Sequence, residues 1–219
     1  MTYYSFDTAS DTHETGPVFP QIKGMRQGYD FTRANSIHNL NYGQLPGFVP
    51  DLNYFSLNDR AKTTDLLSNM ISPFGFLLST KLKEILEKFK LPDHAFYQAS
   101  VDLANIKLNN YFWFLPICNL SDQVDYTKTK FYSKDAFNNV EKLIINNHED
   151  IVEIKPKIGY TKKIVSENIY FKSGFRLDYD LFMIGGFDFN IYISEDLKSA
   201  LIKERISGIK LKPISNLVF

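Results

Sequence analysis

The sequence predicts an α+β protein in which a mixed or mainly antiparallel sheet carries a few short amphipathic helices. Aromatic residues make up 15% of the 219 residues, with 19 Phe and 13 Tyr, and such side chains favour strands. Residues 187–194, "FDFNIYIS", alternate between apolar and polar side chains, which is typical of a half-buried strand. Serine-capped apolar stripes with helical spacing occur twice, and they predict the helices.

Composition and charge exclude several kinds of partner. The 25 Lys and Arg residues balance the 25 Asp and Glu residues, so no overall field attracts nucleic acid or an anionic membrane. Cys118 is the single cysteine and lies in an apolar run, which excludes a disulfide framework and fits a reducing compartment. The sequence has neither a signal peptide nor an apolar run of the ~18 residues that a membrane span needs. We therefore expect a cytoplasmic protein that does not act at a membrane.

Residues 1–60 are expected to form an irregular N-terminal arm with one or two short strands, and residues 61–219 to form the main domain. Aromatic residues such as Tyr29 and Tyr42 indicate that the arm packs on this domain. Glycine and proline break up any regular structure in the arm. These breakers are Gly16, Pro17, Pro20, Gly24, Gly28, Gly43, Pro46, Gly47 and Pro50.

The first regular segment is "FLLSTKLKEILEKFKLP", residues 76–92. A short strand runs into Ser79, whose hydroxyl can cap the helix that follows, and Pro92 ends that helix. Two strands follow, "AFYQASVDL" and "NNYFWFLPICNL", and the second is apolar enough to be buried on both faces. The apolar stripe of the helix consists of Leu82, Ile85, Leu86 and Phe89.

The middle of the chain predicts one helix and then short strands. Ser133 can cap a helix in "SKDAFNNVEKLIINN". Residues 148–174 are expected to form short strands and turns. The stripe of the predicted helix consists of Phe137, Val140, Leu143 and Ile144.

The C-terminal third repeats the first segment. Gly185 and Gly186 predict a hairpin turn before the strand of residues 187–194, and Ser194 then caps a second helix. The match predicts an internal duplication or two similar elements packed on one sheet, although capped helices also converge by chance. The second helix has Leu197, Lys198, Ala200 and Leu201 where the first has Leu82, Lys83, Ile85 and Leu86.

The order of these motifs resembles that of a bacterial family of immunity proteins from polymorphic toxin systems, the Imm11 type, also catalogued as DUF1629. The resemblance covers residues 65–219 and leaves the arm outside. It implies a cytoplasmic protein that binds and blocks a toxin domain, and it assigns no catalytic residue. The matching positions are Ser79, Leu82 and Lys83; Pro92, His94, Phe96 and Tyr97; Asp122 and Asp125; and Ser194, Leu197, Lys198, Leu201, Gly208, Ile209 and Leu211.

The familiar catalytic and metal-binding motifs do not occur, so we predict no catalytic, cofactor-binding or metal-binding residues. His13, His38, His94 and His148 share no spacing typical of metal ligands. We expect His94 to satisfy a local carbonyl after the helix, and Cys118 to be an inert buried thiol.

Two charged segments leave alternatives open. Asp178, Asp180 and Asp188 flank the hairpin, where they could bind Ca²⁺, act as acid and base, meet a basic toxin, or form a solvated face. The other segment, Lys155–Lys172, could grip single-stranded nucleic acid, but lysines also protect the edges of sheets. We favour the solvated face and the edge. The basic segment contains Lys155, Lys157, Lys162, Lys163 and Lys172, interleaved with Tyr160, Tyr170 and Phe171.

The function predicted first is a non-enzymatic immunity protein that neutralises a cognate toxin through a protein–protein interface. A small-molecule or carbohydrate-binding module that uses the surplus of aromatic residues is the alternative. A hydrolase that uses Asp178, Asp180 and Asp188 comes third.

Overall fold

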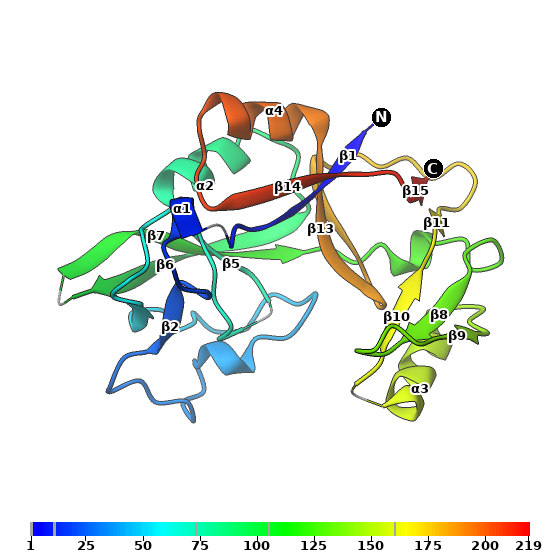
Figure 1. Ribbon diagram of the computed structural model, residues 1–219, viewed down its shortest axis with the longest axis horizontal. Helices are drawn as coiled ribbons and strands as arrows, with labels where there is room; N and C mark the ends of the chain where they lie inside the picture. The colour runs from blue at the N-terminus through cyan, green and yellow to red at the C-terminus, as the bar shows by residue number, and fades with distance from the viewer. Residues whose placement is uncertain (1, 11, 73, 105, 160) are drawn as a thin grey trace.

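A computed structural model of the protein describes residues 2–10, 12–72, 74–104, 106–159 and 161–219 and confirms the predicted α+β class (Figure 1). These residues form four sheets, and most of the strand pairs are antiparallel. Within the same residues, none of the helices has the length and apolar character needed to cross a membrane.

The larger sheet has the strand order β2-β3-β6-β7-β5-β4. Its strands are β2 (Ile22–Met25), β3 (Phe55–Leu57), β4 (Leu66–Leu67), β5 (Phe76–Ser79), β6 (Asp93–Leu103) and β7 (Ile106–Ile117). The second sheet has the order β12-β13-β1-β14, with β12 (Leu181–Gly185), β13 (Asp188–Ser194), β1 (Tyr3–Thr8) and β14 (Ile209–Ile214).

Two small sheets and the helices complete the fold. The small sheets have the orders β10-β8-β9 and β11-β15. Their strands are β8 (Phe131–Lys134), β9 (Val140–Leu143), β10 (Lys163–Ser166), β11 (Ile169–Tyr170) and β15 (Leu217–Val218). The helices are α1 (Thr12–Thr15), α2 (Thr80–Leu86), α3 (His148–Ile158) and α4 (Glu195–Lys203), with short 3₁₀ turns at Ile37–Asn39 and Ser121–Gln123.

Two parts of the larger sheets share one architecture, and we call them the first and second units. The first unit is β4, β5, β7 and β6 in that spatial order, with α2 after β5. The second unit is β12, β13, β1 and β14 in that order, with α4 after β13. Neighbouring strands are antiparallel in both units. Because β1 takes the place of β7, the second unit is assembled from both ends of the chain.

The pairing registers of the two units also match. The capping serine faces a tyrosine on the next strand, and that tyrosine faces a residue equally far after the serine on the third strand. The prediction of two similar capped elements is therefore confirmed as a repeat of fold, but the alternative that both pack on one sheet is wrong, because they belong to two different sheets. These triplets are Ser79, Tyr111 and Ala99 in the first unit and Ser194, Tyr3 and Ile214 in the second.

Two aspartates fasten the units to each other. Each accepts a 2.7 Å hydrogen bond from the capping serine of its own unit, and the pairs are Asp65–Ser79 and Asp180–Ser194. Each also accepts a bond from the chain that follows the helix of the other unit. Asp65 Oδ2 accepts from the amide and the hydroxyl of Ser207, at 2.9 and 2.8 Å, and Asp180 Oδ2 accepts from the amide of Lys90 at 3.0 Å. Helices α2 and α4 consequently lie in contact above the sheets (Figure 1).

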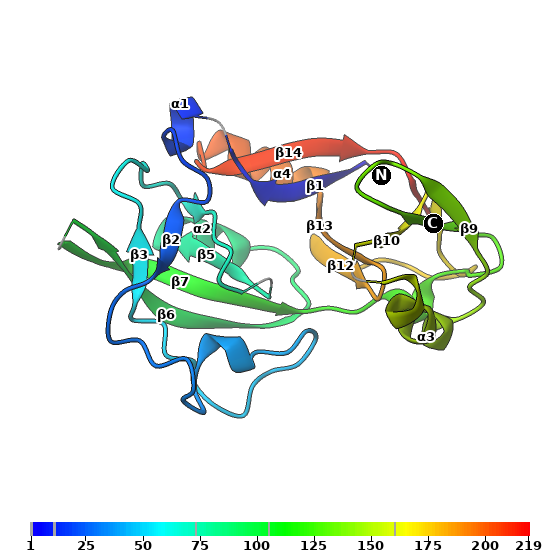
Figure 2. The same ribbon diagram turned by 60° about the horizontal axis from the view of Figure 1, so that its bottom comes forward.

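The faces of the units that point away from these helices, which we call the outer faces, are covered by different segments. Residues 22–57 cover the first unit, where the Phe55 ring stacks on Trp113 with centroids 5.8 Å apart. The segment from residue 118 to 177, which contains α3, covers the second unit together with the C-terminus. This segment lies at the end of the molecule opposite to residues 22–57 (Figure 2). There the Phe219 ring stacks on Phe171 and also contacts Tyr3.

Residues 22–57 of the predicted arm include β2 and β3 and bury Tyr29, Ile37 and Leu52 in one cluster with residues of the first unit. Strand β1, however, lies in the middle of the second unit instead of at the surface of the body. The division of the chain at residue 60 stays a prediction, because strand pairing does not show which segments fold independently.

The helix predicted in residues 133–147 is wrong, because β8 and β9 form a hairpin there. Asp135 turns the chain by accepting hydrogen bonds from the amides of Phe137 and Asn139, and Asn138 has a φ of 66°. Such local side-chain bonds compete with a helix. Phe137 is 87% exposed, so the apolar stripe is not buried either.

The short strands expected in residues 148–174 are partly wrong, because α3 occupies the first of these residues. Asn147 caps this helix by accepting from the amide of Asp150 at 2.9 Å, and Glu149 lies in its first turn. Pro156 lies inside the last turn, where a proline usually predicts a break.

Two smaller expectations also need correction. Helix α2 ends at Leu86, before the Pro92 predicted to stop it. The alternation predicted for residues 187–194 does not separate buried from exposed side chains, because Ile191 and Tyr192 are both buried while Phe189 is 45% exposed. The last four residues of β13 are all buried, so both faces of the strand are covered at that end, and α4 contacts the strand there.

Candidate functional site

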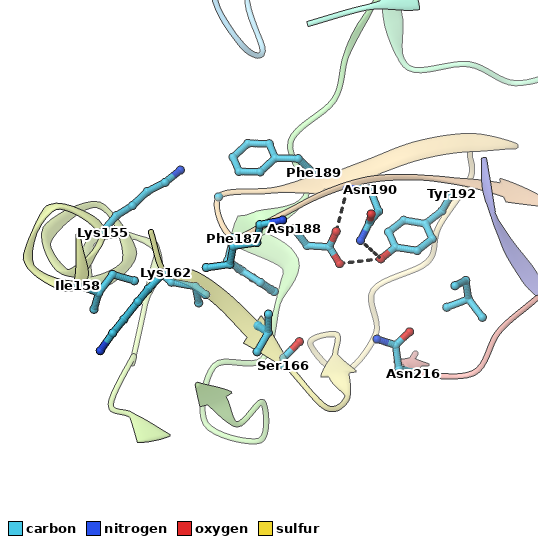
Figure 3. Close-up of a pocket in the computed structure, with 15 residues that line it drawn as sticks. Lys155, Ile158, Lys162, Ser166, Phe187, Asp188, Phe189, Asn190, Tyr192 and Asn216 are labelled. Carbon is cyan, nitrogen blue, oxygen red and sulfur yellow. Dashed lines mark hydrogen bonds between the residues drawn. The ribbon is translucent and has the colours of Figure 1, made fainter. Parts of the chain in front are cut away.

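A groove lies beside the second unit, bounded by the β12–β13 hairpin, helix α3 and strand β10 (Figure 3). It consists of a polar hollow of about 680 Å³ and an adjoining apolar hollow of about 380 Å³. Lys155 and Phe189 line both hollows, and Lys155 Nζ lies 4.9 Å from the centroid of the Phe189 ring. This cation–π contact marks the junction of the two hollows.

The polar hollow contains a carboxylate held by its own strand. The turn at Gly185 and Gly186, with φ angles of 82° and 64°, places Asp188 at the start of β13. Asp188 Oδ2 accepts a 2.6 Å hydrogen bond from the Tyr192 hydroxyl, and Oδ1 accepts from the Asn190 amide at 2.9 Å (Figure 3).

Burial controls the protonation of this pair. Loss of solvent raises the pKa of Asp188, although the hydrogen bonds from Tyr192 and Asn190 oppose the change. Burial and the neighbouring carboxylate both raise the pKa of Tyr192, so the phenol stays protonated near neutral pH. The two hydrogen bonds accepted by Asp188 hold the carboxylate and the phenol together as a hydrogen-bonding surface.

The cations of the polar hollow lie towards α3. Lys155 projects from α3, Lys162 lies in the turn after it, and Lys163 begins β10. Lys162 forms a 3.3 Å ion pair with Glu141 of β9. In Figure 3, Lys155 and Lys162 are at the α3 end of the hollow and Asn216 is at the other end, so charge is unevenly distributed along the groove.

The apolar hollow lies between the two units. Phe74 and Phe76 reach it from the first unit, and Met183, Phe189 and Ile191 from the second. Tyr42 closes it from the arm, with its ring centroid 5.1 Å from that of Phe189. The Tyr42 hydroxyl donates a 2.9 Å hydrogen bond to the Cys118 carbonyl, which fixes the ring, and burial raises its pKa. Such a hollow is suited to an apolar side chain.

The three aspartates predicted to lie near one another do not form one cluster. Asp180 binds Ser194 at one end of β13, whereas Asp188 is at the other end, roughly 20 Å away at about 3.3 Å per residue. Asp178 is exposed and pairs with Lys90 at 2.6 Å. Among the described residues, no group of three or more His, Cys, Asp or Glu side chains is placed to hold a metal ion.

The basic segment Lys155–Lys172 is divided between different elements. Lys155 and Lys157 lie on α3, and Lys163 lies on β10, which is an edge strand of its sheet. Lys172 lines a separate hollow near Asp122. Tyr160 lies outside the described residues. The edge interpretation thus fits Lys163 alone, and the segment forms no continuous basic and aromatic stripe.

The remaining candidates have local roles. His94 Nδ1 lies 2.7 Å from the Pro92 carbonyl oxygen, as predicted. Cys118 is buried, its thiol donates to the Met183 carbonyl, and burial raises its pKa, which matches the predicted inert thiol.

The sequence interpretation missed the residues that build the apolar hollow. The sequence predicts Tyr42 only as an aromatic of the arm and assigns no role to Phe74. The one sequence signal for this hollow was the tripeptide "FGF" at residues 74–76. In the structure Gly75 has a φ of 110° and lies against Trp113, which leaves no room for a side chain.

The chain belongs to the α+β class, and its two similar units are bordered on one side by a groove. The family model of the Immunity protein family (Imm11) matches residues 2–216, and the chain belongs to this family. The resemblance is therefore confirmed, and its predicted limit at residue 65 is corrected because the match includes nearly all of the arm. No curated protein matches the chain.

Proposed function

We propose that this chain is a non-enzymatic immunity protein that binds and neutralises a cognate bacterial toxin domain in the cytoplasm. The observation that supports the proposal most is the family match over residues 2–216. A neutralising protein needs a rigid surface of roughly 800 Å² that fits its partner. The two units, fastened through Asp65 and Asp180, supply such a rigid body.

Co-expression tests this function. The toxin domain encoded beside the gene for this chain is expressed in bacterial cells with and without the chain. Growth should be restored only when the chain is present, and purified components should reach full neutralisation at one chain per toxin. Cell death despite abundant soluble chain would contradict the function. Neutralisation by a small fraction of one chain per toxin would contradict a non-enzymatic mechanism.

A small-molecule or carbohydrate-binding module is the second candidate, and the aromatic lining of the apolar hollow by Tyr42, Phe74 and Phe189 supports it. A panel of sugars and small metabolites, measured by thermal shift, tests this candidate. One compound should raise the unfolding temperature of the wild-type chain and have no effect on the Phe189→Ala variant.

A further inference from the structure

We propose that the groove binds an extended, acidic segment of the toxin, with one apolar side chain of that segment in the apolar hollow. The proposal rests on the function proposed above and names the surface that performs it. Four observations carry it: the repeat within the fold, a free strand edge, the charge of the polar hollow, and the shape of the apolar hollow.

The first unit shows what covers this kind of surface. Its outer face lies under residues 22–57, and β3 pairs with β6 at its edge. The equivalent edge in the second unit is β14, and no described strand pairs with its outer side. Tyr192 and Ile214, which belong to the outer face of the second unit, line the polar hollow instead. The groove thus runs beside the outer face of the second unit, where Tyr192 is itself buried, and next to a strand edge that no described strand covers.

Strand β10 offers a backbone edge inside the groove. It pairs with β8 on one side, and the described residues place no strand on its other side. Its four residues, from Lys163 to Ser166, all line the polar hollow. An extended segment can add to such an edge through main-chain hydrogen bonds.

The charge of the groove selects an acidic segment. Lys155, Lys162 and Lys163 line the polar hollow, and Asp188 is the single carboxylate among its described lining residues. Both oxygens of that carboxylate already accept hydrogen bonds within β13, from Tyr192 and Asn190. Lys155 and Lys163 are exposed at the groove, so carboxylates of a partner find cations there without competition from Asp188.

The apolar hollow offers a pocket for the apolar side chain that anchors the segment. Phe189 is 45% exposed, and it stands at the junction with Lys155 above it. An apolar side chain placed between Phe189, Phe74 and Met183 lies beside Lys155, which lines both hollows. The segment that fits therefore has an apolar residue next to its acidic residues.

Binding measurements with the full chain and the purified toxin domain from the adjacent gene test the proposal. The double variant Lys155→Glu/Lys163→Glu should weaken the complex by roughly tenfold or more, and the loss should shrink as salt is added. Phe189→Ala should weaken it by about fivefold. Matched controls are Lys157→Glu, on the same helix outside the groove, and Phe137→Ala, at an exposed turn, and both should bind like the wild type.

Hydrogen exchange provides a readout that does not depend on substitutions. Amides of β10 that point away from β8 should exchange more slowly in the complex than in the free chain. A wild-type chain that does not bind the toxin overturns the function and this inference together. A wild-type chain that binds, with groove variants that bind equally well and unchanged exchange at β10, overturns the inference alone. Tight binding of a single-stranded RNA oligonucleotide that depends on Lys155 and Lys163 overturns it as well, in favour of a nucleic-acid site.

Discussion

The first and second units have equivalent strands, the same capped helix and the same register, yet among the described residues the polar hollow is lined by the second unit and not by the first. At one equivalent position on the outer face, Leu77 in the first unit becomes Tyr192 in the second, and at another Trp113 becomes Ser5. Leu77 and Trp113 are buried in the cluster that includes the arm, whereas Tyr192, which is also buried, lines the polar hollow. The comparison teaches that the units share the pattern that builds the body and differ at outer-face positions, one of which lines the polar hollow.

The units also keep one surface contact in common. Lys83 lies over the ring of Phe112 at 5.3 Å, and its counterpart Lys198 lies over Tyr4 at 4.9 Å. These partners occupy equivalent places on β7 and β1. Strand β1 thus behaves as the missing strand of the second unit in its side-chain contacts as well as in its register.

The largest expected effect comes from removing that strand. Deletion of residues 1–9 leaves β13 and β14 without the strand between them and removes the buried Tyr3 and Phe6. The loss should exceed the roughly 5–15 kcal/mol that stabilises an ordinary domain, so the shortened chain should not fold. Circular dichroism and gel filtration check this outcome. A folded monomer would show that the second unit does not need β1 and that the predicted division after the arm is sound.

Truncation of the equivalent core leucines comes next. Leu82 and Leu197 are fully buried at matching positions of α2 and α4. Each Leu→Ala change should lower the free energy of unfolding by about 3 kcal/mol, because it removes buried methyl groups and leaves a cavity. Urea denaturation measures both. A difference larger than about 2 kcal/mol between the two variants would mean that the units are not equivalent in packing.

The aspartates that fasten the units should show a graded loss. Asp65→Ala removes three hydrogen bonds, from Ser79 and from the amide and hydroxyl of Ser207, and should cost about 3 kcal/mol. Asp180→Ala removes bonds from the Ser194 hydroxyl and the Lys90 amide and should cost about 2 kcal/mol. Denaturant midpoints measure which variant loses more stability, and a larger loss of stability for Asp180→Ala than for Asp65→Ala would contradict the prediction. Ser79→Ala in the Asp65→Ala background should cost less than in the wild type, since the two residues share one bond.

The helix caps and the turn could be predicted from the sequence because each depends on a few adjacent residues. Ser79 and Ser194 predict the starts of helices, and Gly185 with Gly186 predicts a turn. Both kinds of prediction succeed because caps and turns depend on nearby backbone groups. The same reasoning failed at residues 133–147, where Asp135 closes a turn with its own side chain. Helical spacing alone could not show that bond.

The groove could not be predicted from the sequence, for a different reason. Tyr42, Phe74, Asp188 and Lys155 come from four segments that are distant in the sequence and meet only in the folded chain. Pairing of Tyr3 with Ser194 leaves no local signature in either segment. The resemblance to the immunity family predicted the class correctly, but its motifs mark the repeated body and not the surface beside it.

The smallest expected effect is on the pH dependence of stability, and it concerns Asp188, the hydrogen-bond partner of the Tyr192 that distinguishes the second unit from the first. Burial raises the pKa of Asp188 above its unfolded value, so between the two values the folded chain holds the proton that the unfolded chain has lost. The contribution of this group is therefore fully present below the unfolded pKa of about 3.9 and is lost as pH rises through the folded pKa. Asp188→Asn has no such loss. Its free energy of unfolding, relative to the wild type, should increase steadily as pH rises from acid to neutral.

Tyr192→Phe sharpens the same test, because it gives the second unit an apolar residue where the first has Leu77. The Tyr192 hydroxyl lowers the pKa of Asp188 through its 2.6 Å hydrogen bond, so its removal should raise that pKa further. The variant should then lose more stability than the wild type as pH rises, whereas Tyr192→Phe in the Asp188→Asn background should show no such trend. Urea midpoints at a series of pH values measure all four chains. Parallel curves for the wild type and both single variants would show that Asp188 is solvated and that the polar hollow is open to water in the free protein.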